Sequence, residues 1–140
     1  MAEKLLIVDD DANVRFVLQE AFTADYAVFA ATDGNSAIEI VKKERPAIVL
    51  LDINMPEPDG LAVLQLIKET GQKPVIWMLT GVEDLETVVK TLKLGASGYI
   101  TKPFDIVKVR EIVAGAAQGL AHKEGDKPSD RPWRIKKQKK

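Results

Sequence analysis

Several chemical functions are excluded by what the 140-residue chain does not contain. It has no cysteine, so disulfide bonds, thiolate metal ligands and a cysteine nucleophile are ruled out. No apolar stretch approaches the roughly 18 residues of a membrane span, so we expect no membrane segment. The nine glycines never form the GxxxxGK loop, followed by Ser or Thr, that cradles nucleotide phosphates, so direct ATP hydrolysis is not expected.

Composition and charge divide the chain into two parts. A hydrophobic content of 46% is normal for a globular core, and the length suits about one domain. Residues 1–122 carry 18 acidic and 12 basic side chains, whereas residues 123–140 carry 3 acidic and 8 basic ones. We therefore expect a folded domain at 1–122 and a basic tail or linker at 123–140. The N-terminus leads directly into a strand-like run, so we expect no signal peptide and a cytoplasmic protein.

Apolar runs and helical periodicity alternate along the chain. Strands are predicted at residues 5–8, 26–31, 47–51, 74–79 and 98–101. Amphipathic patterns separate them, including a helix predicted at 59–69 with Gly71 just past its end and a last helix capped by Asp105. Five such units predict an α/β fold: a doubly wound, five-stranded parallel sheet of flavodoxin-like order 2-1-3-4-5, with helices on both faces.

Polar residues stand where four of the predicted strands end. Asp9 and Asp10 follow the first strand, Asp52 the third, Thr80 the fourth and Lys102 the fifth. The intervals between them are whole numbers of strand–helix units. Because ligands of such sheets bind outside the carboxyl ends of the strands, we expect all of these residues at that one edge, the carboxyl edge.

These side chains are suited to holding a divalent cation and a phosphoryl group. Crowded carboxylates repel one another unless a cation or a proton intervenes. Oxygen ligands without histidine or cysteine suit Mg²⁺, with Mn²⁺ as an alternative. Lys102 is predicted to lie opposite, too far away to ligate the metal, with a gap between metal and ammonium in which a phosphoryl group is stabilised.

Asp52 is the best candidate nucleophile of the group. Its strand is central in the predicted order, between the strand that precedes Asp9 and Asp10 and the strand that ends at Thr80. Attack of this carboxylate on phosphorus would give an aspartyl phosphate, and Thr80 would donate a hydrogen bond to one of the phosphoryl oxygens.

Four segments of the chain, in this order and at this spacing, resemble the receiver domain of two-component response regulators, the CheY-like superfamily. They are LLIVDDD at 5–11, LDINMPEPDG at 51–60, MLTG at 78–81 and GASGYITKPF at 95–104. Each alone is a weak signal, because Asp-Gly turns and Lys-Pro pairs are common. All four together are a strong signal, and the resemblance covers about residues 4–121.

The resemblance implies that Asp52 is a phosphoacceptor. It would receive a phosphoryl group from a phosphohistidine on a sensor histidine kinase or a histidine phosphotransfer protein. Asp9, Asp10, Asp52 and the backbone carbonyl of Asn54 would hold Mg²⁺, and Lys102 would pair with the phosphoryl group. Such a protein assists only its own phosphorylation and dephosphorylation, so it is a signalling module rather than a conventional enzyme.

The resemblance also implies a conformational switch. Thr80 would follow the phosphoryl group, and Tyr99 aligns with an aromatic residue that then swings inward. The surface of the fourth helix, fifth strand and fifth helix would change, and a downstream effector protein or domain would read that change. In this family the Lys-Pro peptide, here Lys102-Pro103, is cis.

The remaining expectations concern partners. His122, the only histidine, is expected at the surface at the end of the last helix, so the chain is an acceptor rather than a phosphohistidine donor. Nucleic-acid contact through the folded domain is not expected, nor is contact with a membrane. The sequence is compatible with a monomer or with a phosphorylation-dependent homodimer.

Two other functions and some ordinary structural roles stay open. A Mg²⁺-dependent phosphatase of the haloacid dehalogenase type also forms an aspartyl phosphate, although this chain is short for that family and lacks a cap insertion. A phosphate-inert receiver used only for docking is the second alternative. The run of acids at 9–11 could simply cap the first helix, and Tyr99 could be a half-buried strand residue with no switching role.

Overall fold

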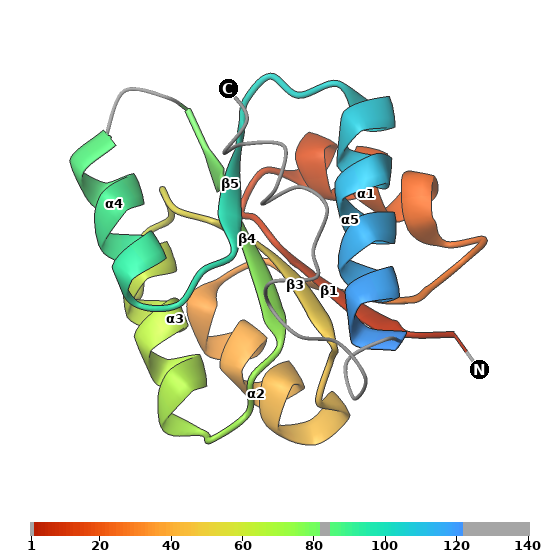
Figure 1. Ribbon diagram of the computed structural model, residues 1–140. Helices are drawn as coiled ribbons and strands as arrows, with labels where there is room; N and C mark the ends of the chain where they lie inside the picture. Colours follow the sequence, from red (N-terminus) through yellow and green to blue (C-terminus); the bar gives the residue numbers. More distant parts are fainter. Residues whose placement is uncertain (1, 82–84, 122–140) are drawn as a thin grey trace, which may run out of the picture.

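All five predicted strand–helix units are present in the computed structural model, which describes residues 2–81 and 85–121. The strands are β1 (Lys4–Val8), β2 (Ala27–Ala31), β3 (Ile48–Asp52), β4 (Val75–Thr80) and β5 (Gly98–Thr101). The helices are α1 (Ala12–Phe22), α2 (Gly34–Glu44), α3 (Gly60–Glu69), α4 (Leu85–Lys93) and α5 (Ile106–Ala121). Figure 1 shows the strands side by side between the helices.

The strands form one parallel sheet in the order β2-β1-β3-β4-β5, which confirms the predicted topology. The central strand, β3, is apolar up to Asp52, and all five of its residues are buried. Continuous apolar sequence is what a strand covered on both faces requires. The carboxyl ends of β1, β3, β4 and β5 consequently lie next to one another.

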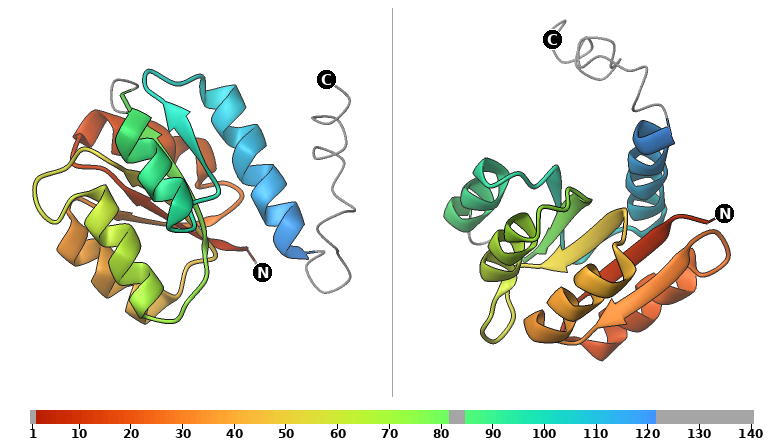
Figure 2. Two further views of the ribbon diagram at one scale, coloured as in Figure 1. Left: turned by 60° about the vertical axis from the view of Figure 1, so that its left-hand side comes forward. Right: turned by 90° about the horizontal axis from the view of Figure 1, so that it is seen from below.

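Two layers of helices cover the sheet. Side chains from α2, α3 and α4 pack with one set of strand residues, and side chains from α1 and α5 pack with the other set. Neighbouring strand residues therefore point to opposite faces: Leu6 and Val8 belong to the first cluster, Leu5 and Ile7 to the second. Figure 2 shows α2, α3 and α4 in a row on one side of the sheet, with α5 on the other.

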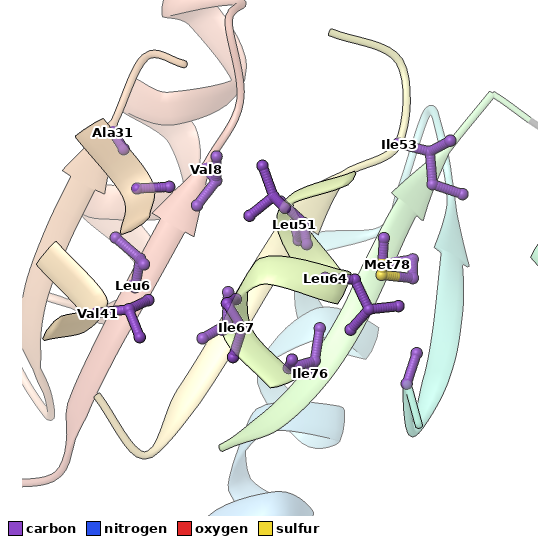
Figure 3. Close-up of a cluster of buried hydrophobic side chains, with 14 of the residues drawn as sticks. Leu6, Val8, Ala31, Val41, Leu51, Ile53, Leu64, Ile67, Ile76 and Met78 are labelled. Atoms are coloured by element: carbon purple, nitrogen blue, oxygen red, sulfur yellow. The ribbon is translucent and has the colours of Figure 1, made fainter. Parts of the chain in front are cut away.

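The first cluster fills the space between the sheet and helices α2 and α3. Figure 3 shows Leu6 and Val8 of β1, Leu51 of β3 and Ile76 and Met78 of β4 reaching toward it, where they meet Val41 of α2 and Leu64 and Ile67 of α3. Each of these side chains is at most 4% exposed. Complete burial of one such side chain stabilises a fold by about 1.5–3 kcal/mol, so this layer holds the strand ends rigidly in place.

Aspartates begin most of the helices at the carboxyl edge. The side chains of Asp11, Asp33 and Asp59 accept hydrogen bonds from backbone N–H groups in the first turns of α1, α2 and α3. The carboxylate of Asp105 accepts one from Val107 N at 2.9 Å at the start of α5. The capping roles predicted for Asp11 and Asp105 are thereby confirmed, and acids at these positions also favour the helix dipole.

Element boundaries differ slightly from the predicted ones. β3 and β4 each continue one residue further than predicted, so Asp52 and Thr80 are the last residues of their strands rather than the first residues beyond them. Gly71 lies past the end of α3 with φ +83°, in the left-handed region that glycine tolerates best, as its predicted position requires. His122 and the tail at 123–140 lie outside the described residues. None of the helices within residues 2–81 and 85–121 combines the length and apolarity that a bilayer crossing demands.

Gly60 allows α3 to begin directly against the end of β3. Its backbone N–H donates to the carbonyl of Ile53 at 3.0 Å. A Cβ atom at this position would lie 2.3 Å from the carbonyl oxygen of Asp52 and 2.6 Å from Cα of Ile53. Both neighbours are backbone atoms and cannot rotate away. The close approach that fixes the backbone around Asp52 therefore depends on glycine.

We predict that Gly60→Ala lowers the free energy of unfolding by about 1–3 kcal/mol, because the added methyl group displaces backbone. Gly115→Ala is the matched control, since a Cβ there has nothing within 4 Å and the residue lies inside α5. Alanine at 115 should stabilise the protein by about 0.5–1 kcal/mol. Urea unfolding measures both values. A Gly60→Ala protein as stable as the unsubstituted one would contradict the close approach.

Candidate functional site

The sheet places the predicted polar residues along four adjacent strand ends. Asp9 follows β1, Asp52 ends β3, Thr80 ends β4 and Lys102 follows β5. Asp9, Asp52 and Thr80 are 0%, 2% and 1% exposed, so these polar groups are buried at the carboxyl edge. The structure thus brings together the residues that the strand-end pattern indicated.

Three carboxylates form a cluster at this edge. One carboxylate oxygen each of Asp9, Asp10 and Asp52 lies within 4.8 Å of the others, and Asp10 is the exposed member. Oδ1 of Asp9 accepts a hydrogen bond from the backbone N–H of Asp11 at 2.9 Å. A donor set of carboxylate oxygens, partly open to solvent, fits a hard cation such as Mg²⁺ or Mn²⁺.

Lys102 contacts two of these carboxylates directly. Its Nζ lies 2.8 Å from Oδ2 of Asp9 and 3.4 Å from Oδ1 of Asp52. Its backbone N–H donates to the carbonyl of Thr80 at 2.7 Å, and the Lys102-Pro103 peptide is cis. The ammonium group pairs with these carboxylates and offsets their mutual repulsion, and the gap predicted between a bound metal and Lys102 stays a prediction.

The crowding changes the acidity of the central carboxylate. Burial raises the pKa of Asp52 to about 6, and the neighbouring Asp9 carboxylate raises it too. The Lys102 ammonium and the backbone N–H of Asn54, which donates to Asp52 Oδ1 at 3.1 Å, oppose this rise. For Lys102, burial lowers the pKa, but the hydrogen bond to Asp9 and the nearby acidic charges outweigh that effect, so the pKa is raised.

The positions of Asn54, Thr80 and Tyr99 do not test the roles predicted for them, so these roles stay predictions. Asn54 is exposed just beyond β3, and its carbonyl remains a predicted metal ligand. Thr80 is buried at the end of β4, paired in register with Thr101. Tyr99 is 41% exposed on β5, and a switching role and an ordinary strand role are both compatible with that exposure.

Arg15 is a contact of this site that sequence reasoning missed. It lies in α1, is half-buried, and its Nη1 donates to the carbonyl of Asp9 at 2.9 Å. It therefore ties the first turns of α1 to the end of β1. The helical periodicity of the sequence does not indicate that the Arg15 side chain turns back toward the end of β1.

Comparisons with known proteins agree on one family for this chain. A family model for the response regulator receiver domain matches residues 5–114. Sporulation initiation phosphotransferase F of Bacillus subtilis (strain 168) is 39% identical over 114 residues, which are 81% of this chain and 92% of that protein. The probable transcriptional regulator ycf27 of Porphyridium aerugineum is 41% identical over 103 residues, which are 73% of this chain but only 42% of that protein.

Solved structures give the same result. The chemotaxis protein CheY4 of Vibrio cholerae superimposes with a TM-score of 0.78 at 27% sequence identity, covering 83% of this chain and 99% of that one. The chain therefore spans nearly all of two of these relatives and less than half of the third.

The raised pKa of Asp52 predicts a pH-dependent stability. Because folding raises this pKa above the ordinary value of 3.8, the group's stabilising contribution is full below about pH 4 and is lost as the pH rises through about 6. Asp52→Asn, which mimics the protonated acid, should raise the free energy of unfolding by about 2–3 kcal/mol at pH 8, with the gain shrinking toward pH 4.5. Urea unfolding in EDTA measures this difference.

Glu69→Gln is the control for that experiment, since Glu69 is an exposed acid at the end of α3. It should leave the pH profile unchanged. A gain from Asp52→Asn of the same size at pH 4.5 and pH 8 would show that burial and Asp9 do not raise the pKa of Asp52.

We predict that Mg²⁺ raises the Tm of the protein and that Asp10→Asn removes most of this rise. A cation that binds only the folded state stabilises it, and losing one carboxylate ligand should weaken binding about 10-fold or more. Asp11→Asn is the matched control, because Asp11 caps α1 and asparagine caps equally well. Thermal unfolding with MgCl₂ or with NaCl at equal ionic strength tests this. An equal rise in both variants would exclude Asp10 as a ligand.

Proposed function

The chain belongs to the response regulator receiver domain family, and we propose that Asp52 accepts a phosphoryl group from a phosphohistidine on a partner protein. The observation that carries this proposal is the position of the Asp52 carboxylate. It is buried at the carboxyl edge, grouped with Asp9 and Asp10, and lies 3.4 Å from the Lys102 ammonium. Of the three acids, Asp52 alone ends a strand that is buried throughout.

The proposed step is a single phosphoryl transfer. A carboxylate oxygen of Asp52 attacks phosphorus, a P–O bond forms, the P–N bond to the partner's imidazole breaks, and that nitrogen keeps the electron pair. Asp52 must be ionised to attack. With a pKa of about 6 it is mostly ionised at pH 7 and above.

The residues around Asp52 are suited to stabilising the transferred charge. Asp9, Asp10, Asp52 and the Asn54 carbonyl would hold Mg²⁺, which when bound neutralises negative charge on the phosphoryl oxygens. Lys102 supplies a fixed positive charge on the same edge, and its contacts with Asp9 and Asp52 support a role in orienting the acceptor. The backbone N–H of Asn54 holds one oxygen of Asp52, which restricts rotation of the carboxylate.

Phosphorylation would be read through Thr80 and Tyr99. Thr80 ends β4 beside Asp52 on β3, since Asp52 pairs in register with Leu79. Tyr99 lies on the neighbouring β5, opposite Met78. A threonine that moves toward the new phosphoryl group would vacate space next to this strand, and a partly exposed tyrosine could then move inward. The surface formed by α4, β5 and α5 would change as a result.

Response regulators act between histidine kinases and effectors, and we propose both kinds of partner for this chain. A sensor kinase or a phosphotransfer protein would supply the phosphoryl group, and an effector protein or domain would read the switch. The location in the cytoplasm expected from the sequence stays a prediction, as does a monomer or a phosphorylation-dependent homodimer. The dehalogenase-type phosphatase is not favoured, because the matches are to receiver domains.

We predict that acetyl phosphate with Mg²⁺ adds one phosphoryl group to the protein and that Asp52→Asn abolishes the addition. Lys102→Ala should slow labelling about 100-fold, because a charge that acts on the transferring group is lost, while Mg²⁺ still raises the Tm. Intact-mass measurement follows the labelling. Asp11→Asn changes an exposed acid that caps α1, and Lys73→Ala changes an exposed lysine between α3 and β4; both variants should label normally.

Each alternative has its own outcome in this experiment. Stoichiometric labelling of Asp52→Asn would refute the assignment of the acceptor. No labelling of a protein whose Tm still rises with Mg²⁺ would identify a receiver used only for docking. Repeated turnover of small phosphoesters would identify a phosphatase.

A further inference from the structure

A cleft of about 410 Å³ lies between α5 and the segment that joins α1 to β2. Figure 1 shows α1 and α5 on the same side of the molecule. Its floor is aromatic: the rings of Phe22 and Tyr26 meet edge to face, with centroids 5.6 Å apart. Its wall on α5 includes Val107, which is 58% exposed, and Ala114. Phe22 is only 2% exposed, so the accessible apolar surface comes from Val107, Ala114 and the half-buried Tyr26, and this surface suits a large apolar side chain.

The charges around this cleft are mainly negative. Asp25 and Glu111 line it, together with one cation, Arg110. The pKa of Tyr26 is raised by burial first, and then by the negative charges of Asp25 and Glu3. An occupant that places basic residues on either side of an apolar one would therefore fit both the floor and the surroundings.

The basic tail contains such a segment. Trp133 and Ile135 stand in the run RPWRIKK at 131–137, where the only charges are basic. Over the whole tail, 8 basic residues stand against 3 acidic ones. Tryptophan, tyrosine and arginine are the residue types enriched at the centre of protein contacts, and the segment and the cleft together supply all three.

The tail is also long enough to reach the cleft. Along α5, the helical rise places Ala121 about 21 Å beyond Val107. The twelve residues from Ala121 to Trp133 can span up to about 40 Å. Because the tail is tethered next to the cleft, its local concentration is on the order of millimolar, so even a weak contact would be populated.

We propose that Trp133, flanked by its basic neighbours, docks intramolecularly into the cleft formed by Phe22, Tyr26 and the Val107 side of α5. A second group of exposed apolar residues, Leu85, Val89 and Leu92 on α4 and Tyr99 on β5, is a poorer match. α4 carries Lys90 and Lys93 in its last turn, and these would repel a basic segment. The docked tail would occupy the flank of α5 next to α1 and leave the α4–β5 surface uncovered.

The test compares backbone amide NMR spectra of the full-length, unphosphorylated protein with those of Trp133→Ala. Docking predicts chemical-shift changes at residues 22–26 and 107–114, far from the substitution in sequence. Lys139→Ala is the matched tail control and should leave those amides nearly unchanged. Changes confined to the tail, or mapped instead to α4 and β5, would overturn the proposal. So would changes that depend on protein concentration, because they would indicate a second copy as the partner.

Changes within the cleft provide the reciprocal test. Val107→Gln should move the Trp133 indole N–H resonance toward the position it has in a short tail peptide, and high salt should do the same. Phe16→Gln is the matched control, since Phe16 is an equally exposed apolar residue, 64% accessible, on α1 and outside the cleft. An indole resonance that ignores Val107→Gln, or that responds equally to Phe16→Gln, would exclude this cleft as the docking site.

Discussion

The contact of the Lys102 ammonium with Asp9 and Asp52 is what allows two buried carboxylates to lie together at the carboxyl edge of the sheet. Removing a carboxylate from water without a partner is strongly unfavourable, and two such groups side by side also repel each other. One cation within 2.8 Å and 3.4 Å of them offsets part of both penalties. It does not neutralise the group, because one positive charge faces two carboxylates and Asp10 adds a third. The remaining excess of negative charge is what a divalent cation would balance.

The parallel sheet makes this arrangement possible with few residues. β1, β3, β4 and β5 are adjacent, so one side chain at each carboxyl end is enough to build the group. The helices restrain the connecting loops, because α1 starts three residues after Asp9 and α3 eight residues after Asp52, and Asp11 and Asp59 cap them. The charged side chains therefore project from elements that two packed layers hold in place. Short loops on rigid strands give the precise positions that phosphoryl transfer requires.

The fold and the membership of the site were largely predictable, whereas the contacts within the site were not. Alternating apolar runs and helical periods predict the strand order because each unit obeys general packing rules. The same reasoning places Asp9, Asp52, Thr80 and Lys102 at one edge. It does not give the direct contacts of the Lys102 ammonium with Asp9 and Asp52, because strand spacing fixes where a Cα atom lies and not how far a long side chain reaches. The Arg15 contact and the need for glycine at 60 likewise depend on backbone distances that no periodicity encodes.

Stability and reactivity are opposed at Asp52, and a bound cation would reduce that opposition. Burial holds the Asp52 carboxylate in place and shields it from solvent. It is also the largest cause of the raised Asp52 pKa of about 6, which reduces the ionised fraction that can attack phosphorus. Asp52 would be ionised more completely when it ligates a metal, since a positive charge lowers its pKa. The same binding relieves the repulsion that destabilises the fold. The burial of Asp52 and the repulsion among the three carboxylates would therefore affect metal affinity, folding stability and ionisation of the nucleophile together.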